Sequence, residues 1–374
     1  MEFGALVKEN NAERSAKGFS CWTQLVSMLF CQLAHADSLR EICNGLGCCV
    51  GKLVHLGIAK APNKSTLSYA NEHRPAKLYE DLFYSALKRF RDEGGLGQRK
   101  RTFRFKNKLL SLDSTTISLC LKLFPWAEFR RAKGGVKAHV LLDHDDYLPS
   151  YVLITEAKRS DVKMATAFPL NPGSIVAMDR GYNDYALFGQ WTTEEIYFVT
   201  RLKENAAYAV VEECALPKDR NIRSDQMIRL TGVQAQKDCP CLLRRVAVWD
   251  TVKEREIVLL TNLLAFGATT IAAIYKDRWE IELFFKALKQ NLKVKSFVGT
   301  SENALRIQIW TALIAILLLK WLHHLSKAKW SLSNLASMLR LNLFTYRDLR
   351  TWLDGPFETP PLLPHPQQLT LPLA

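Results

Sequence analysis

The residue pattern changes near residue 108, and this change limits the folds that the chain can adopt. Upstream of it, apolar residues recur at helical spacing, as between Phe19 and Leu33. Downstream, the runs KLLSLDSTTISL, SIVAMD and YFVTRLK are typical of strands, and a helical segment separates the last two. Strands that alternate with helices favour a mixed sheet. The sequence therefore predicts an all-α N-terminal domain followed by an α/β core.

Helix start signals organise the first hundred residues. Ser38 and Glu41 form a capping box, and Pro62 precedes the segment KSTLSYANEHR. Short helices separated by a turn suit insertion into the major groove of DNA, although many small helical bundles share this pattern. The polar side chains of the segment that could face the groove are Lys64, Ser65, Thr66, Ser68, Asn71 and Arg74.

The charge of the chain indicates a polyanionic partner. Lys and Arg number 51 against 37 Asp and Glu, which gives a net charge of +14. Residues 1–110 hold 18 of these basic residues and 10 of the acidic ones, so they account for +8 of the +14. The basic run GQRKRTFRFKNK at 97–108 is either a solvated linker or an arm that contacts DNA phosphates. Some soluble proteins are basic without binding nucleic acid.

The cysteines and the longest apolar run favour a cytoplasmic protein without a membrane partner. Nine cysteines in a large chain without a secretory leader indicate reduced thiols. Neither Cys48-Cys49 nor Cys239-Pro240-Cys241 has zinc-site spacing, so we interpret them as packing residues. The run IWTALIAILLL at 309–319 is about half of what a bilayer requires, and it is predicted to be a core helix.

Two aspartates follow apolar strands. Asp113 ends the run KLLSLD, and Asp179 ends SIVAMD. Ligands collect beyond the carboxyl ends of strands in open α/β sheets, so two such acids can meet if their strands are neighbours. An aspartate after a strand is also commonly a turn or cap residue, and Asp179 could pair with Arg180. Lys137 and His139 could face the same site, or be a strand cation and a satisfied core histidine.

The stretch YKDRWEIELFFKALKQ at 275–290 offers a third acid. On one helix, a stripe about 60° wide beside the apolar face holds Tyr275, Arg278, Glu282 and Lys289. A surface helix with ordinary salt bridges would explain this stripe equally well. If the helix packs on the sheet, Glu282 supplies a third carboxylate.

Three carboxylates and a basic stripe suit phosphodiester chemistry. Three hard oxygen ligands repel one another, and a pair of Mg²⁺ ions would relieve that repulsion. Arg278 and Lys289 would then grip DNA phosphates, and Tyr275 could hydrogen-bond one of them. Trp279 would stack on a base or, more simply, be buried.

These residues resemble the DDE transposases of bacterial insertion sequences, in the cut-and-paste group marked by YxxRxxxExxxxxxK. Tyr275, Arg278, Glu282 and Lys289 match every fixed letter of that signature. The segments LDSTTI and MDRGYNDY resemble those around the first and second acids of the family. The first hundred residues resemble an N-terminal helical domain that often precedes the catalytic core, so the resemblance covers nearly the whole chain.

The resemblance implies a ribonuclease-H-like core that binds two Mg²⁺ ions, with Mn²⁺ as a substitute. Asp113 would bridge the metals, and Asp179 and Glu282 would each complete one of them. The implied activity is cleavage of double-stranded DNA at terminal inverted repeats and transfer of the freed 3′ ends into target DNA, typically through a hairpin intermediate. A homodimer in the synaptic complex and a nucleoid-associated location follow from the same resemblance.

Pattern and resemblance together give an expected domain organisation. It comprises an all-α DNA-binding domain at 1–96, a basic linker at 97–108, the first part of a ribonuclease-H-like mixed-sheet core at 109–206, a β-rich insertion at 207–264, the helical second part of the core at 265–355 and a Pro-rich tail at 356–374. Two alternatives stay open. They are a metal-dependent DNA nuclease without strand transfer and a non-catalytic DNA-binding regulator in which the acids are structural.

Overall fold

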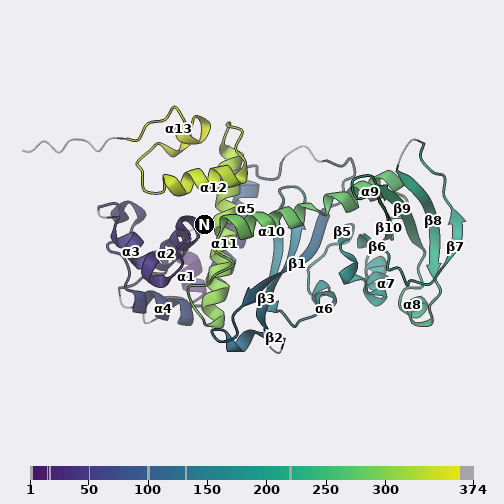
Figure 1. The fold of residues 1–374 in the computed structure, drawn as a ribbon, viewed down its shortest axis with the longest axis horizontal. Helices are drawn as coiled ribbons and strands as arrows, with labels where there is room; N and C mark the ends of the chain where they lie inside the picture. The colour runs from purple at the N-terminus through teal and green to yellow at the C-terminus, as the bar shows by residue number, and fades with distance from the viewer. Residues whose placement is uncertain are drawn as a thin grey trace, which may run out of the picture. The chain divides into compact units, whose positions relative to one another are not determined.

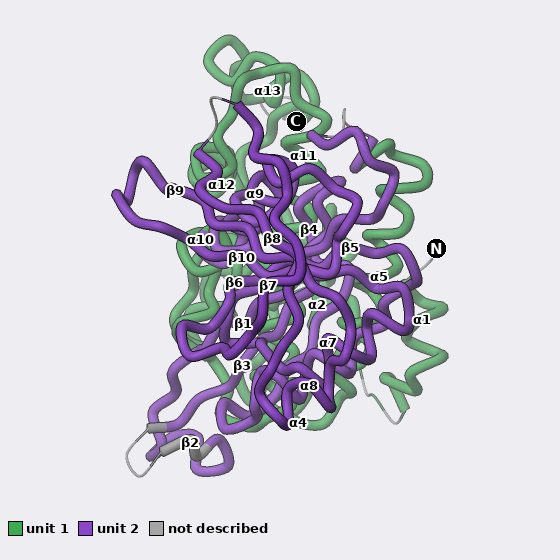
Figure 2. The backbone as a smooth tube through the Cα atoms, turned by 90° about the vertical axis from the view of Figure 1, so that its right-hand side faces the viewer, with its two compact units in different colours: residues 1–96, 287–374 green, residues 97–286 purple. Residues whose placement is uncertain are grey.

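The chain forms two compact units (Figure 2). The computed structural model describes residues 3–14, 16, 18–49, 51–98, 102–130, 133–218 and 221–362. Unit 1 combines residues 1–96 with 287–374, and unit 2 comprises residues 97–286. The boundary falls inside α10 (Glu280–Asn291). The domain limits expected from the sequence remain predictions, and parts of the basic linker (99–101) and of the tail (363–374) lie outside the described residues.

Unit 1 is helical throughout its described regular structure (Figure 1). Its helices are α1 (Phe3–Glu9), α2 (Cys21–Ala34), α3 (Leu39–Gly47), η1 (Leu53–Leu56), α4 (Lys64–His73), α5 (Lys77–Asp92), α11 (Glu302–Leu325), α12 (Leu332–Leu341) and α13 (Leu349–Asp354). The capping box is confirmed: Ser38 Oγ accepts a hydrogen bond from the N–H of Glu41, and Glu41 Oε2 accepts one from the N–H of Asp37. The sequence therefore predicted where these helices start.

The longest helix, α11, is the core of unit 1. It packs against α2, α4, α5 and α12. By length and composition it could cross a membrane, but 72% of its most apolar window is buried inside the structure. The prediction of a core helix is confirmed, because neighbouring helices cover the apolar surface that a bilayer would otherwise cover.

The expected groove-facing side chains of α4 divide into two groups. Lys64, Ser65 and Ser68 are exposed. Asn71 is buried, where its amide oxygen accepts a hydrogen bond from Gln24 at 2.8 Å. Asn71 therefore stabilises the bundle, and we correct its expected place on the outer face of the helix. Burial follows from its position one helical turn after the buried Leu67.

Unit 2 is built on one mixed sheet, which has ten strands in the described residues. The order is β2-β3-β1-β5-β6-β10-β9-β8-β7, with β4 also paired to β3. The strands are β1 (Leu109–Leu119), β2 (Glu128–Arg130), β3 (Lys133–Asp143), β4 (Leu148–Glu156), β5 (Ile175–Met178), β6 (Tyr197–Arg201), β7 (Tyr208–Glu213), β8 (Ile222–Leu230), β9 (Leu243–Asp250) and β10 (Arg255–Thr261). The mixed sheet predicted from the sequence is confirmed, and β7 to β10 lie within the range 207–264 where strands were expected.

The direction of pairing changes at β1. β3 and β4 form an antiparallel meander beside it, whereas β5 and β6 run parallel to it. The insertion strands continue the same sheet, because β10 pairs antiparallel with β6. The helical elements of unit 2 are η2 (Pro125–Ala127), α6 (Asp161–Ala165), η3 (Arg180–Tyr182), α7 (Tyr185–Thr193), α8 (Val233–Asp238) and α9 (Ala268–Asp277), followed by α10.

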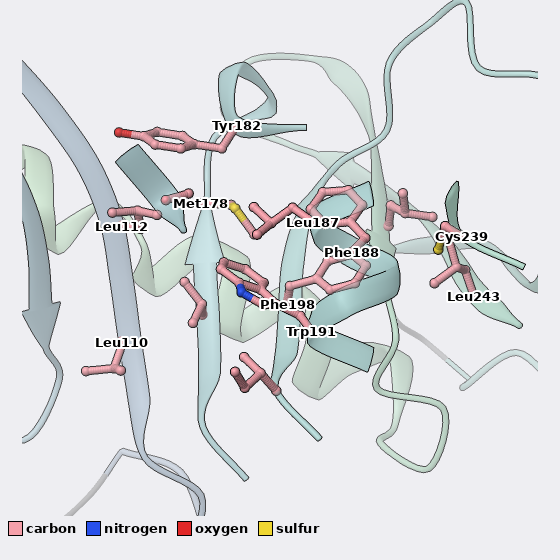
Figure 3. Packing of buried hydrophobic residues seen from close by; sticks show 14 of the residues in the cluster. Leu110, Leu112, Met178, Tyr182, Leu187, Phe188, Trp191, Phe198, Cys239 and Leu243 are labelled. Carbon is pink, nitrogen blue, oxygen red and sulfur yellow. The ribbon is translucent and has the colours of Figure 1, made fainter. Parts of the chain in front are cut away.

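Each face of this sheet has its own apolar core. On one face, Leu112, Met178 and Phe198 pack with Phe188 and other residues of α7 (Figure 3). On the other, strand residues such as Ala177 pack with α9. Successive residues of a strand point to opposite faces, so β5 supplies both cores within the four residues IVAM, all of which are buried. This double burial explains why the strand reads as a continuous apolar run.

Two local predictions are wrong. Asp113 does not end its strand, since β1 continues to Leu119 with alternating burial of its last residues. The single helix expected over 275–290 is two helices, because α9 ends at Asp277 and α10 begins at Glu280. The break comprises residues 278 and 279 and is called the elbow below. The helical period of the apolar residues continues across it, so the sequence did not reveal the interruption.

Candidate active site

The register between β1 and β5 brings two aspartates to the same level of the sheet. The parallel pairing runs from Leu109 opposite Ile175 to Leu112 opposite Met178. The next residue on each strand is an aspartate, Asp113 on one and Asp179 on the other. Neighbouring strands lie about 4.8 Å apart, so the two backbone positions are adjacent.

Asp179 does not serve as a cap or as an internal partner of its neighbour. It occupies the N-cap position of η3, but its side chain makes no capping hydrogen bond. Arg180 pairs with Glu204 instead, at 3.3 Å. The two structural explanations that the sequence allowed for Asp179 therefore do not describe this structure.

The elbow between α9 and α10 brings Glu282 toward the first aspartate through an arginine. Arg278 Nη1 lies 3.5 Å from Asp113 Oδ2, and Arg278 Nη2 lies 2.8 Å from Glu282 Oε1. The arginine is only 9% exposed. A buried guanidinium therefore stands between the carboxylates of Asp113 and Glu282, which are far apart in the sequence.

The charges of Asp179 and Glu282 both act on Asp113. Burial, with smaller contributions from the charges of Asp179 and Glu282, raises the pKa of Asp113 from 3.8 to about 6. The backbone N–H of Ser114, at 2.8 Å, and the charge of Arg278 oppose this rise. A carboxyl group with such a raised pKa at the meeting point of two others favours a bound cation.

The donor set suits a divalent metal ion, although the carboxylates do not form a ready ligand cluster. In the described parts of the chain, no group of three or more His, Cys, Asp or Glu side chains is placed to hold a metal. Arg278 now supplies the positive charge between Asp113 and Glu282. Hard carboxylate oxygens are ligands that Mg²⁺ and Mn²⁺ accept.

The basic stripe is divided between the two units. Tyr275 lies beside the site, with the guanidinium of Arg278 5.6 Å from the centre of its ring. Burial raises the pKa of Tyr275, while the nearby charges of Arg278 and Arg201 lower it. Lys289 lies in the last turn of α10, in the segment that belongs to unit 1. Burial and the charge of Lys295 lower the pKa of Lys289.

Trp279 is exposed, which corrects the expectation that it would be buried. Its side chain is 49% exposed, and Lys253 Nζ lies 5.5 Å from the centre of its ring. The physical reason is the elbow, since Trp279 occupies one of the two positions between the helices. An exposed indole beside a lysine remains compatible with stacking on a base.

Sequence reasoning missed Asp161, which lies behind the site on the α6 side of β1. Its carboxylate contacts Lys137 Nζ at 3.0 Å and accepts a hydrogen bond from Ser114 Oγ at 2.9 Å. His139 is fully buried, and burial lowers its pKa to about 4. Lys137 and His139 are therefore a paired cation and a neutral core histidine. The first residue of α6 gives no signal of this contact in the sequence.

The fold and the site define a class of protein, a mixed α/β domain with carboxylates from several segments near one another. Comparisons with known proteins identify the family. Residues 104–318 match the model described as "Transposase DDE domain", a range that contains all three acids. Residues 1–59 match a domain of unknown function (DUF4372).

The chain also resembles whole proteins of several bacteria. It is 32% identical over 303 residues to the protein y4zB of Sinorhizobium fredii, which covers 77% of this chain and 80% of that protein. It is also 31% identical over 237 residues to a protein of Geobacillus stearothermophilus named for insertion sequence element IS5377. This match covers 63% of this chain and 62% of that protein. The names of both describe transposases. The chain belongs to the DDE transposase family, and it is an enzyme of the nuclease and transferase class that acts on DNA.

Proposed function

We propose that this protein is a cut-and-paste transposase of the YREK group. It is the transposase of an insertion sequence, as the family and the names of its relatives indicate. In our proposal it binds the inverted repeats that end the element, cleaves them, and transfers the freed 3′ ends into target DNA. The single observation that carries the proposal is the register of β1 and β5, which makes Asp113 and Asp179 neighbours.

The three carboxylates are the proposed catalytic residues. Asp113 takes the central position, since its pKa responds to both Asp179 and Glu282. Together they would hold two Mg²⁺ ions, or Mn²⁺ as a substitute, which when bound activate a water or hydroxyl and stabilise the leaving oxygen of a phosphodiester. The chain itself holds Asp113 within β1, Asp179 directly after the neighbouring strand β5, and Glu282 in the first turn of α10.

Three further side chains are proposed to bind the DNA strand at the site. Arg278 presents a planar guanidinium, which suits bidentate contact with a phosphate. Tyr275 packs against it, and Lys289 lies two helical turns beyond Glu282 on α10. In the structure Arg278 neutralises Asp113 and Glu282, so binding of metal ions and of DNA would redistribute its contacts.

The fold supports a ribonuclease-H-like assignment for part of unit 2. An antiparallel meander (β1, β3, β4) followed by two parallel strands that alternate with helices agrees with such a core. We further propose that the N-terminal helices and the basic segment 97–108 bind DNA, that the protein acts as a homodimer in the synaptic complex, and that it works at the nucleoid in the cytoplasm.

The decisive experiment compares cleavage with binding. Asp113→Asn, Asp179→Asn and Glu282→Gln should each abolish Mg²⁺-dependent cleavage of DNA carrying the element's ends, while binding to the same DNA in EDTA persists. Glu194→Gln, which removes an exposed carboxylate of the same unit, is the matched control and should cleave normally. Full cleavage by any of the three site variants would refute the assignment.

A second assay separates the transposase from a plain nuclease. A substrate already cut to expose its 3′ hydroxyl should be joined to target DNA by the wild-type protein and not by Asp113→Asn. If cleavage occurs but the exposed 3′ end is never joined, the protein is a nuclease without strand transfer. If neither reaction occurs and calorimetry on the DNA complex detects no binding of Mg²⁺ or Mn²⁺, it is a DNA-binding regulator.

A further inference from the structure

Three polar side chains of unit 2 form a row of short hydrogen bonds beside the acids. Ser111 Oγ lies 2.6 Å from His144 Nε2, and His144 Nδ1 lies 2.6 Å from Asp277 Oδ2. Ser111 is fully buried, and the side chains of His144 and Asp277 are 5% and 20% exposed. The row joins three segments that are remote in sequence: β1, the turn after β3, and the end of α9.

This row resembles a hydrolytic Ser-His-Asp triad only in its order of groups. A nucleophile must reach its substrate. Ser111 has no exposed surface, and the cavity beside His144 and Asp277 measures about 30 Å³. A space of that size holds on the order of one water molecule. The row therefore does not perform chemistry on a substrate, and its effect must pass through the segments that it connects.

Both ends of the row adjoin the proposed active site. Ser111 precedes Asp113 by two residues on β1, so the two side chains share a face of the sheet. Asp277 immediately precedes Arg278, which contacts Asp113. The elbow between α9 and α10 is thus tied to one face of β1 at two points. One tie runs through His144, and the other is the ion pair of Arg278.

Nothing in the local sequence of the elbow requires the helix to be interrupted there. The residues from 276 to 281 are KDRWEI, without glycine or proline. The turn is tightened by bonds from the N–H of Ile281 to Arg278 O and from the N–H of Glu282 to Trp279 O. Tertiary contacts are therefore the structural feature that accompanies this interruption, and Glu282 lies in the first turn of α10.

We propose that His144 is a positioning residue that holds the elbow and so sets how far Glu282 lies from Asp113. This inference rests on the proposed role of Glu282. Removing the imidazole leaves the carboxylate of Asp277 and the buried hydroxyl of Ser111 without their shared partner, which makes the present position of the elbow less favourable. The ion pair of Arg278 with Asp113 would remain as a connection between the elbow and β1.

The first test measures the elbow directly, without DNA or metal. In His144→Ala, backbone amides of residues 275–286 should exchange with deuterium about tenfold faster than in the wild type, while those of α7 do not change. Phe198→Leu is the control for general destabilisation, since Phe198 lies in the core on the opposite face of the sheet. An elbow that exchanges no faster in His144→Ala than in Phe198→Leu would overturn the proposal.

The second test asks whether the hydrogen bond matters for the reaction. In His144→Ala the Mg²⁺ concentration that gives half-maximal cleavage should rise by about tenfold, because a displaced Glu282 must be brought back, with DNA binding in EDTA unchanged. Asp277→Asn keeps an oxygen that accepts from His144 and should behave as the wild type, whereas Asp277→Ala should behave as His144→Ala. A wild-type Mg²⁺ midpoint in both alanine variants would contradict the proposal.

These results are separable from those on the proposed function. If Glu282→Gln cleaved normally, the assignment of the catalytic acids would fail while the exchange experiment still decided whether His144 holds the elbow. If His144→Ala does not fold, Asp277→Ala provides the same exchange comparison, because Asp277 is the more exposed end of the row. An unchanged elbow in that variant refutes the proposal.

A separate observation concerns two thiols in the insertion. Cys239 caps the end of α8 and is 1% exposed, and Cys241 precedes β9 and is partly exposed. Their Sγ atoms lie 2.9 Å apart. The hydrogen bond between the two thiols lowers the pKa of Cys241 to about 6, with smaller lowering effects from Thr192 and Arg229, while burial opposes this shift. A reachable thiolate thus lies beside a buried thiol.

We infer that Cys239 and Cys241 are a modification site that hydroperoxides convert into a disulfide. The Cys241 thiolate attacks one peroxide oxygen, the O–O bond breaks, and a sulfenic acid and hydroxide result. The sulfur of Cys239 then displaces the sulfenic oxygen, which leaves as water with the Cys239 proton, and the S–S bond forms. The pair thereby loses two electrons to the peroxide.

Mass spectrometry of peptides after treatment with limiting hydrogen peroxide tests this inference. The peptide holding both thiols should lose two hydrogens before the exposed Cys48 and Cys120 react, and dithiothreitol should restore it. Cys239→Ser should instead accumulate a sulfenic acid at Cys241, and Cys241→Ser should remain reduced. Oxidation of Cys48 or Cys120 ahead of the pair would overturn the inference.

Discussion

The two faces of the sheet in unit 2 are built in different ways. On the α7 face, Phe188 and Phe198 stack with ring centres 4.0 Å apart, and both are fully buried. The α9 face has a smaller apolar core, and next to it lie the polar groups that include Asp113 and Arg278. Apolar packing holds the first face, whereas directional contacts between charged and polar groups position the elements of the second. The proposed catalytic groups are thus held by interactions that a single substitution can remove.

The largest expected effect comes from the aromatic face. Phe188→Ala should lower the free energy of unfolding by about 3–5 kcal/mol, because it removes a buried ring and leaves a cavity in a closely packed core. Urea unfolding measures this loss. At a temperature where the variant stays folded, its cleavage rate should equal that of the wild type. A cleavage defect in fully folded protein would show that the two faces are not independent.

On the α9 face, replacing the Asp113 carboxylate should raise the free energy of unfolding of the protein. The pKa of Asp113 is about 6 in the folded protein and 3.8 in the unfolded chain, so folding becomes less favourable as pH rises from 3.8 to 6. Asp113→Asn removes this penalty, which amounts to about 3 kcal/mol at pH 7 and vanishes below pH 4. Unfolding in urea at pH 4 and pH 7, without divalent ions, measures both values. A variant less stable than the wild type at pH 7 would contradict the prediction.

His139 should produce a pH dependence of the opposite sign. Its pKa falls from 6.5 in the unfolded chain to about 4 in the folded protein, so its contribution is present above pH 6.5 and is lost as pH falls to 4. The loss is up to about 3 kcal/mol, which offsets the change at Asp113 over much the same range. His139→Gln should therefore lose less stability than the wild type on acidification. His55→Gln, an exposed change, serves as control and should leave the profile unaltered.

The smallest expected effect tests the apolar part of the α9 face. Ile271→Val deletes one buried methylene and should lower the free energy of unfolding by about 1 kcal/mol. The pH dependence of stability should stay as in the wild type, because no titrating group is touched. A changed pH profile would indicate that α9 shifts as a whole and carries Arg278 with it.

Much of this fold could be predicted because the signals are local. A buried strand such as IVAM shows itself as an apolar run, and a capping box marks the start of α3. The proximity of Asp113 and Asp179 was also accessible, because each acid directly follows an apolar run, although Asp113 lies inside its strand rather than at its end. The family resemblance then singled out Glu282, which periodicity alone did not distinguish from a surface residue.

What escaped prediction depends on contacts between distant segments. His144 sits in a turn of ordinary composition, and only the folded chain shows it between Ser111 and Asp277. No sequence pattern marks Asp161 either, and its ion pair with Lys137 is seen only in the folded chain. The elbow at Arg278 and Trp279 is held by tertiary contacts, so the helical period runs through it without a break.

The pairing of β10 with β6 has a mechanical consequence for the insertion. Strands hydrogen-bonded edge to edge resist sliding, so β7 to β10 form a stiff extension of the plate that bears Asp113 and Asp179. The positions of β7 to β10 are therefore fixed relative to β1 and β5 through one continuous set of strand pairings.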